Sequence, residues 1–126
     1  MPTPTSTPTP APANALHVGD IDGTGVKLQQ GAWKAIVTIT IHDSDHAPVA
    51  GAVVSGTFYQ STSVGPLSCT TGASGSCSID SGQLPSKQGK ASFTIETVTH
   101  ASSDYDPSNN HDVDGDSDGT TISLSK

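Results

Sequence analysis

The sequence predicts an all-β fold made of two packed sheets, and three features indicate it. Hydrophobic residues make up 32% of the chain and aromatic residues 4%, with 13 glycines, which suits a thin two-sheet core better than helices. Several short runs alternate apolar and polar residues and are separated by polar turns. No apolar stripe recurs with the 3.6-residue period of a helix. These features predict an antiparallel Greek-key β-sandwich of the immunoglobulin-like type with about seven strands.

The longest alternating run covers residues 33–42. One face of this strand carries Trp33, Ala35, Val37, Ile39 and Ile41. Residues 42–48 are predicted to form a polar turn, and residues 49–59 a second strand with Ala52, Val54, Gly56 and Phe58 in phase. We expect the two strands to pair as a long hairpin, with Trp33 in the core.

Shorter strands are predicted around five further apolar pairs or triplets. They are Leu16 with Val18, Leu67 with Cys69, Cys77 with Ile79, Ala91 with Phe93 and Ile95, and Ile122 with Leu124. The first of these is expected to be short.

The chain divides into a linker at residues 1–14 and one domain at residues 15–126. The linker alternates Pro with Thr, Ser and Ala, a composition that cannot bury surface and that adopts extended conformers. Met1 stands directly before this tract, so we expect a segment cut from a longer precursor. Such a stalk separates independently folded modules, and the predicted partner is a neighbouring domain joined covalently through it.

The net charge of -7 argues against two classes of partner. A negative surface repels nucleic-acid phosphates and anionic lipid headgroups, so neither nucleic acid nor a membrane is expected. No run of about 18 apolar residues exists that could span a bilayer.

Cys69 and Cys77 lie in two β-type runs on either side of a Gly/Ser-rich turn. If the chain turns at residues 72–74, the two cysteines stand opposite each other in a hairpin and can form a disulfide. A disulfide implies an oxidising compartment, hence secretion. The alternative is a pair of free core thiols; no CxxC spacing for zinc or redox chemistry is present.

Several motifs resemble the immunoglobulin-like domains appended to secreted bacterial hydrolases, including subtilisin-type peptidases. They are His-Val-Gly-Asp-Ile-Asp-Gly at 17–23, the segment 33–58, the cysteine pair, and the Asp-rich stretch 105–120. The resemblance covers residues 16–126. It implies an accessory domain without catalytic activity, and no defined ligand follows from it.

The Asp-rich stretch predicts a calcium site. Asp114, Asp116 and Asp118 followed by Gly119 match the first half of a D-x-D-x-D-G loop, in which alternate carboxylates converge on a hard cation. The closing glutamate of an EF-hand is absent, because Ser125 stands at that position. Further oxygens are expected from Asp112 and from a second acidic loop with Asp20 and Asp22. Asp104 and Asp106 are additional candidates. The alternative is a solvated acidic turn.

Other metals are not favoured by the sequence. Magnesium prefers to retain its water, and no Cys/His ligand set for zinc is apparent. His17 and His111 flank the acidic segments and are expected either to pack or to bond the calcium-binding carboxylates. His42 and His46, with Asp43 and Asp45, fit a small surface metal site or a polar turn equally well.

The predicted function is therefore a non-catalytic, calcium-binding accessory domain of a secreted bacterial protein, which stabilises or spaces a partner catalytic domain. No nucleophile elbow or oriented Ser/His/Asp set suggests an enzyme. The alternative is a carbohydrate-binding module that targets a secreted hydrolase to polysaccharide, with glycan contacts from Tyr59, Tyr105 or Trp33. A third hypothesis is a protein-docking surface on the polar face that carries Thr38 and Thr40.

Overall fold

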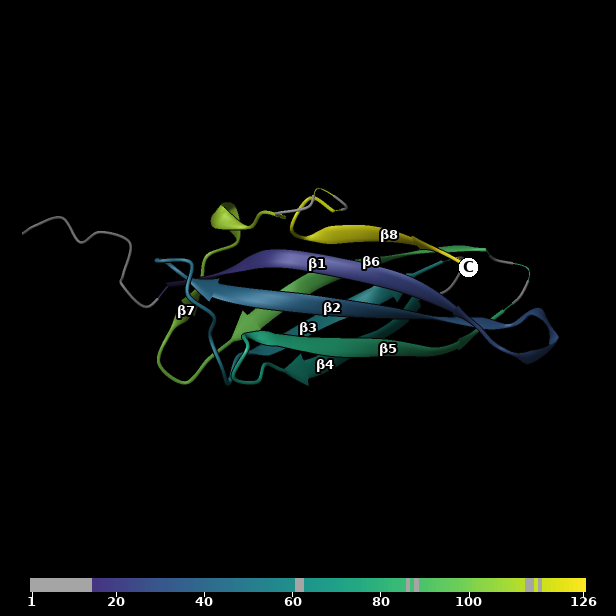
Figure 1. Ribbon diagram of the computed structural model, residues 1–126, viewed down its shortest axis with the longest axis horizontal. Coiled ribbons are helices and arrows are strands. Elements are labelled where there is room, and N and C mark those ends of the chain that lie inside the picture. Colours follow the sequence, from purple (N-terminus) through teal and green to yellow (C-terminus); the bar gives the residue numbers. More distant parts are fainter. Residues whose placement is uncertain (1–14, 61–62, 86, 88, 113–114, 116) are drawn as a thin grey trace, which may run out of the picture.

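The computed structural model describes residues 15–60, 63–85, 87, 89–112, 115 and 117–126, and these form a sandwich of two four-stranded sheets (Figure 1). The first sheet has the order β5-β2-β1-β7, and the second has the order β4-β3-β6-β8. The strands are β1 (Ala15–Lys27), β2 (Trp33–Asp43), β3 (Val53–Tyr59), β4 (Ser63–Thr70), β5 (Ser76–Leu84), β6 (Lys90–Thr99), β7 (Asp104–Tyr105) and β8 (Thr121–Ser125). The predicted all-β sandwich is confirmed, with eight strands where about seven were expected. Only the short β1–β7 pair is parallel among the described pairings.

Two 3-10 turns complete the described elements: η1 (Gln29–Gly31) joins β1 to β2, and η2 (Pro107–Asn109) lies between β7 and β8. In the part of the chain that the structure describes, no helix has the length and apolar character needed to cross a membrane.

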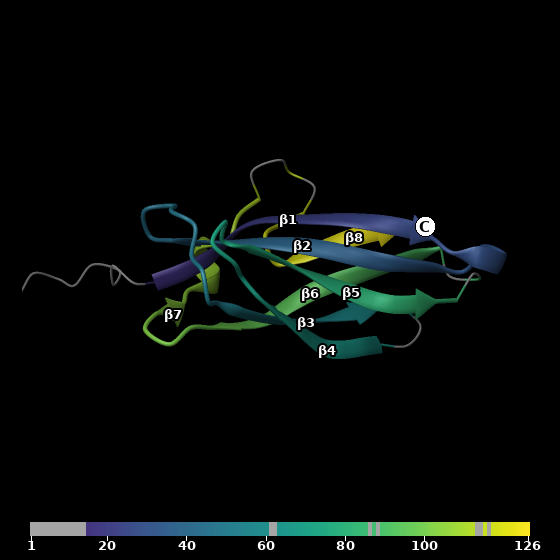
Figure 2. The ribbon, with the colours of Figure 1, turned by 60° about the horizontal axis from the view of Figure 1, so that its bottom comes forward.

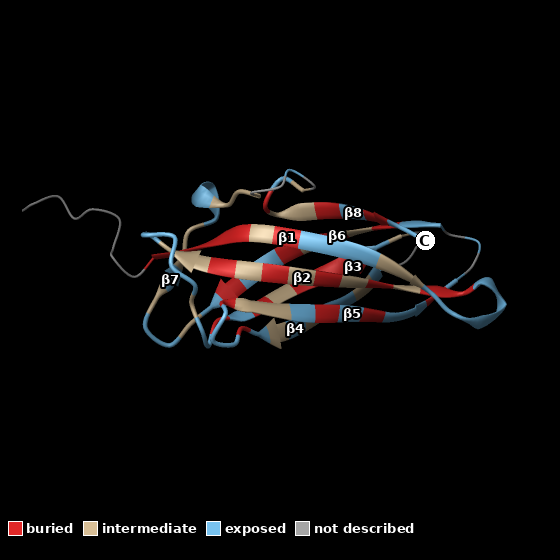
Figure 3. Ribbon diagram, viewed as in Figure 1, coloured by how far each residue is buried: buried red, intermediate tan, exposed pale blue. Residues whose placement is uncertain are grey.

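The core lies between the two sheets and follows the alternation that the sequence predicts. Along β2 every second residue is fully buried, which Figure 3 shows as alternating bands. Trp33 is 0% exposed, and the Phe58 and Phe93 rings contact each other with centroids 4.8 Å apart. Fully burying one such aromatic side chain stabilises a fold by roughly 1.5–3 kcal/mol.

β8 runs beside β1 in both ribbon views, although the two strands belong to different sheets (Figures 1 and 2). Two glycines of β1 make this approach sterically allowed. A Cβ atom at Gly23 would lie 2.6 Å from Leu124 Cδ2, and one at Gly25 would lie 2.1 Å from the Ser125 carbonyl oxygen. The first and last strands therefore lie close together although they belong to different sheets.

The predicted hairpin of residues 33–42 with 49–59 is wrong. The chain does turn back after β2, since Asp43 N–H donates to Ala47 O and Val49 N–H donates to Ile41 O. It then leaves this sheet near Gly51, whose φ is +79°, and β3 pairs with β4 and β6 in the other sheet. Both strands have a strongly apolar face, and period-two alternation alone does not say which neighbour a strand pairs with.

The Cys69–Cys77 disulfide is present, but the strands that it joins are not a hairpin. β4 lies at the edge of the second sheet and β5 at the edge of the first, so the bond bridges the sheets. A tight turn lies between them, with Gly75 N–H donating to Gly72 O and Gly72 N–H donating to Ser76 O. The expectation that the bond closes a hairpin within one sheet is therefore wrong. The two edge strands lie next to each other, so few residues suffice to cross from one sheet to the other.

Candidate metal centre

The predicted calcium ligands do not all lie in loops. Asp20 and Asp22 belong to β1, where they pair in register with Thr40 and Thr38 of β2, so the predicted second acidic loop is wrong. β1 is longer than expected because its polar residues face polar partners on β2. Asp114 and Asp116 lie outside the described residues.

The described carboxylates of the C-terminal Asp-rich segment bond to their own loop. Asp112 Oδ1 accepts from Gly115 N–H at 3.2 Å, and its Oδ2 accepts from the Ser117 hydroxyl. Asp118 Oδ1 accepts from the N–H groups of Thr120 and Thr121 at 2.9 and 2.7 Å. These bonds lower the pKa of Asp118, the Thr121 N–H contributing most. They define turns of the chain.

Of the other acidic candidates, Asp104 lies in β7 and Asp106 stands directly before η2. Asp104 is exposed in β7. Asp106 caps η2, since its Oδ1 accepts from the Ser108 backbone N–H and hydroxyl, and its Oδ2 accepts from the Asn109 side chain. Asp106 therefore has a structural role as a helix cap.

Four of the five histidines gather at the end of the sandwich where β1 begins. One ring nitrogen from each of the four lies within 4.8 Å of the others. The four are His17 of β1, His42 of β2, His46 of the following turn, and His111 between η2 and β8. Among the described residues, these four histidines are the group of at least three potential metal ligands whose ligand atoms lie close together. The expectation that no Cys/His ligand set exists is therefore wrong.

Strand register brings the first two histidines together. His17 and His42 are directly paired between β1 and β2, so their side chains lie on the same face of the sheet. Ile41 beside His42 is fully buried in the core, which places both histidines on the outer face. A Cβ at Gly19 would lie 2.2 Å from His42 Nδ1, so the glycine leaves room for this ring to lie against β1.

A tight turn after β2 adds His46. Asp43 Oδ1 accepts from the backbone N–H groups of Asp45 and Ala47 at 2.8 and 3.0 Å, and His46 N–H donates to Asp43 O. These bonds hold His46 at φ +64°, a left-handed conformation that a residue with a side chain adopts at some energetic cost. The His46 ring then lies 5.0 Å from the His17 ring, measured between centroids.

The segment after η2 adds His111 and covers the cluster. Its backbone is fixed on β1, because His111 N–H donates to Val18 O at 2.9 Å and Val18 N–H donates to Asn110 Oδ1 at 2.8 Å. The His111 and His17 ring centroids are 5.1 Å apart. His111 Nδ1 lies 3.2 Å from Asn109 O. When Nδ1–H donates to that carbonyl, the Nε2 lone pair is left for another partner.

The cluster is buried on one side and open on the other. His17 is only 3% exposed, His42 and His111 are half-buried, and His46 is exposed. A pocket of about 310 Å³ adjoins the cluster and is lined by His17, Ser44, His46, Asn109 and His111. Solvent thus reaches the histidines from one face.

Two ring nitrogens of this cluster are buried without a hydrogen-bond partner in the described part of the chain. They are His17 Nε2 and His42 Nδ1. An unsatisfied buried polar group costs roughly 1–3 kcal/mol. The arrangement is therefore unfavourable unless a water molecule or a bound ligand satisfies these nitrogens.

The surroundings favour the neutral form of His17 and His42. Burial lowers the pKa of His17 below its ordinary value of 6.5, and the neighbouring His111, His46 and His42 lower it further, against an opposing effect of Asp106. Burial likewise lowers the pKa of His42, with contributions from His46 and His111. Neutral imidazole is the form that binds metal ions.

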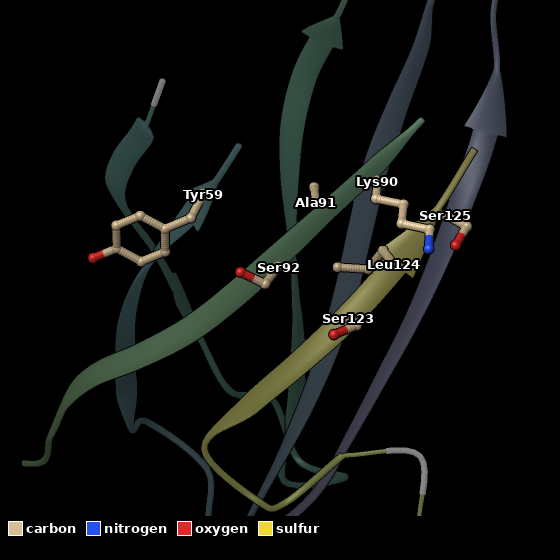
Figure 4. Close-up of a pocket in the computed structure, with 7 residues that line it drawn as sticks. All are labelled: Tyr59, Lys90, Ala91, Ser92, Ser123, Leu124 and Ser125. Carbon is tan, nitrogen blue, oxygen red and sulfur yellow. The ribbon is translucent and has the colours of Figure 1, made fainter. Parts of the chain in front are cut away.

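At the opposite end of the sandwich, Tyr59 borders a groove of about 400 Å³. In Figure 4 the Tyr59 ring stands on one side, Ser123 and Ser125 of β8 on the other, and Ser92 between them. Tyr59 is 43% exposed, and its hydroxyl donates to Glu96 Oε2 at 3.3 Å. Trp33 is buried and cannot present its ring to a glycan. The Tyr105 hydroxyl accepts from Asn110 Nδ2 at 2.6 Å, and burial raises the pKa of Tyr105.

Comparison of the chain with protein-family models, with curated proteins and with solved structures finds no match.

Proposed function

We propose that this chain is a non-catalytic accessory domain of a secreted protein, which spaces and stabilises a neighbour joined through residues 1–14. The observation that carries the proposal is the separation of the two ends of the domain. β1 starts at Ala15, and Lys126 lies against Gly25, ten residues further along the same strand. At about 3.3 Å per residue, the two points are about 30 Å apart. The linker therefore joins the domain at the end opposite Lys126 (Figure 1).

The strand that continues from the linker is well anchored. β1 is an inner strand of its sheet, paired with β2 from Leu16 to Lys27 and with β7 at Ala15 and Leu16. A pull on the linker acts along a strand held by two neighbours, and the disulfide holds the far edges of both sheets together. Both features suit a stiff spacer, and the disulfide fits an oxidising, extracellular setting.

The spacer role can be tested by joining a fluorescent donor domain before residue 1 and an acceptor domain after residue 126. We expect one narrow distribution of transfer efficiencies that stays unchanged up to the onset of unfolding in urea. A Gly/Ser chain of equal length between the same reporters serves as the control and gives a broad distribution. An equally broad distribution for the folded domain would contradict the proposal.

Calcium binding near Asp112 and Asp118 remains part of the proposal. It is supported by the backbone bond between His111 and Val18, which brings the start of the Asp-rich segment beside the part of β1 that carries Asp20. Thermal unfolding in calcium and in chelator tests it. Calcium at 100 times its dissociation constant should stabilise the domain by about 2.7 kcal/mol.

Carbohydrate binding is the second candidate, and the Tyr59 groove is the observation that favours it. The groove combines an exposed aromatic ring with hydroxyl groups, the combination that sugars need for stacking and hydrogen bonding. It lies at the end of the sandwich away from the linker, where it can face a substrate. Pull-down on insoluble polysaccharides is the test. Binding that Tyr59→Ala abolishes and Tyr105→Ala leaves intact would establish this function, and no retention on any polysaccharide would reject it.

A further inference from the structure

The four-histidine cluster is not explained by the spacer role, by the calcium prediction or by the needs of the fold. Packing places apolar side chains in the core, whereas this cluster lies on the outer face of the first sheet and yet hides His17 from solvent. His17 Nε2 is buried and finds no hydrogen-bond partner among the described residues. Four imidazoles from three separate parts of the chain converge there.

We propose that His17, His42, His46 and His111 together bind one late first-row divalent transition-metal ion, such as Zn²⁺ or Cu²⁺, through their ring nitrogens. Bond lengths of about 2.0–2.1 Å to zinc place the nitrogens of a tetrahedral site about 3.4 Å apart. The four ring nitrogens now lie within 4.8 Å of one another, and small rotations of the imidazole rings would bring them to that spacing.

The ligand chemistry selects the class of ion. Four neutral nitrogen donors suit zinc, copper, nickel and cobalt, whereas calcium and magnesium require oxygen ligands. Within this class copper(II) is expected to bind most tightly. The site is thus chemically distinct from the predicted carboxylate site for calcium.

Two groups outside the cluster orient or position its histidines for metal binding. Asn109 O is positioned to accept from His111 Nδ1–H, the arrangement that orients a histidine toward a metal through its other nitrogen. Asp43 folds the turn that holds His46 over His17. Asp43 and Asp106 also lie near enough to act electrostatically on His17, and their negative charges offset that of a divalent cation.

The bound ion would cross-link the start of β1, the end of β2 and the segment after η2. At present the last segment is held on β1 by two hydrogen bonds at Val18, one donated by the His111 backbone N–H and one accepted by the Asn110 side chain. The ion would therefore fix this segment and the turn at residues 44–47 to the sheet. The open pocket gives the ion a path from solvent.

Titration of the untagged protein with Co²⁺ and Zn²⁺ tests the proposal. We expect one Co²⁺ per chain with the intense visible absorption of a tetrahedral nitrogen site, displacement by one Zn²⁺, and a rise of several degrees in the unfolding temperature. Calcium should not displace the cobalt. The proposal would be overturned if Co²⁺ did not bind stoichiometrically, or if its visible absorption stayed as weak as that of the hexahydrated ion.

Variants locate the site. His46→Ala changes an exposed ligand and should leave the metal-free protein folded while weakening zinc binding at least tenfold. His111→Gln should weaken it similarly. The matched control is His100→Ala, since His100 bonds Ala50 O and lies outside the cluster. Equal affinities for the His46→Ala variant, the control and the parent protein would refute the assignment.

Discussion

Removal of the Cys69–Cys77 disulfide is expected to destabilise the domain and to loosen one particular strand. The bond joins β4 at the edge of one sheet to β5 at the edge of the other. β4 alternates exposed and half-buried residues and pairs only with β3 among the described strands. The double change Cys69→Ser with Cys77→Ser leaves this strand without its second anchor.

The size of the effect follows from the length of the closed loop. The two cysteines are 8 positions apart in the sequence. In the chain-entropy description, opening a loop of about nine residues adds roughly 2.5 kcal/mol of conformational freedom to the unfolded state at 25 °C. For a domain of this size, that loss corresponds to a fall of roughly 10 °C in the unfolding temperature.

Urea unfolding measures the free-energy change, and amide hydrogen exchange measures where it acts. We expect faster exchange in Ser63–Thr70 than in Lys90–Thr99, which lies between two neighbours. Ser68→Ala, an exposed change on the same strand, is the control and should stay within about 0.5 kcal/mol of the parent. A double variant that loses less than about 0.5 kcal/mol, or whose β4 exchanges no faster, would refute this reasoning.

Three further predictions address the core, the Asp-rich segment and calcium. Phe93→Ala should cost about 3–5 kcal/mol in urea unfolding, because the ring is fully buried against Phe58; a loss below about 1 kcal/mol would contradict the packing described. Asp118 has a folded pKa below its ordinary value of 3.8, so its stabilising effect is present above that pH and lost as pH falls through the folded pKa. Asp118→Asn should therefore unfold more easily than the parent at pH 7, with a difference that shrinks below pH 3.8 in thermal unfolding, and a pH-independent difference would speak against the titration. Asp116→Ala should lower the unfolding temperature in calcium but hardly in chelator, whereas equal losses in both would exclude a metal role for that residue.

The strands of the sandwich could be predicted from the sequence because alternation is a local property. The apolar face of residues 33–41 is buried as expected, and so are Phe93 and Ile122. The partners of each strand could not be predicted in the same way. They depend on where the chain crosses between sheets, and the crossing near Gly51 leaves no pattern that distinguishes it from a hairpin turn.

The candidate metal centre shows the same limit. His42 and His46 stand four residues apart, and this pair alone fits a small metal site or a polar turn equally well. Their meeting with His17 follows from the β1–β2 register, and their meeting with His111 follows from the backbone bond to Val18. Neither contact leaves a spacing motif, since the ligands come from distant segments. The one usable clue in the sequence is that His17 stands near the start of one strand and His42 at the end of the next, so that both could lie at the same end of the sheet.

Gly23 and Gly25 leave the space that β8 occupies beside β1. A larger residue at either position would push the last strand outward and expose the side of β1 that does not pair with β2. Exposed strand edges template the addition of further chains. The absence of a side chain at these two glycines thus lets β8 cover this edge of β1 as well as closing the sandwich.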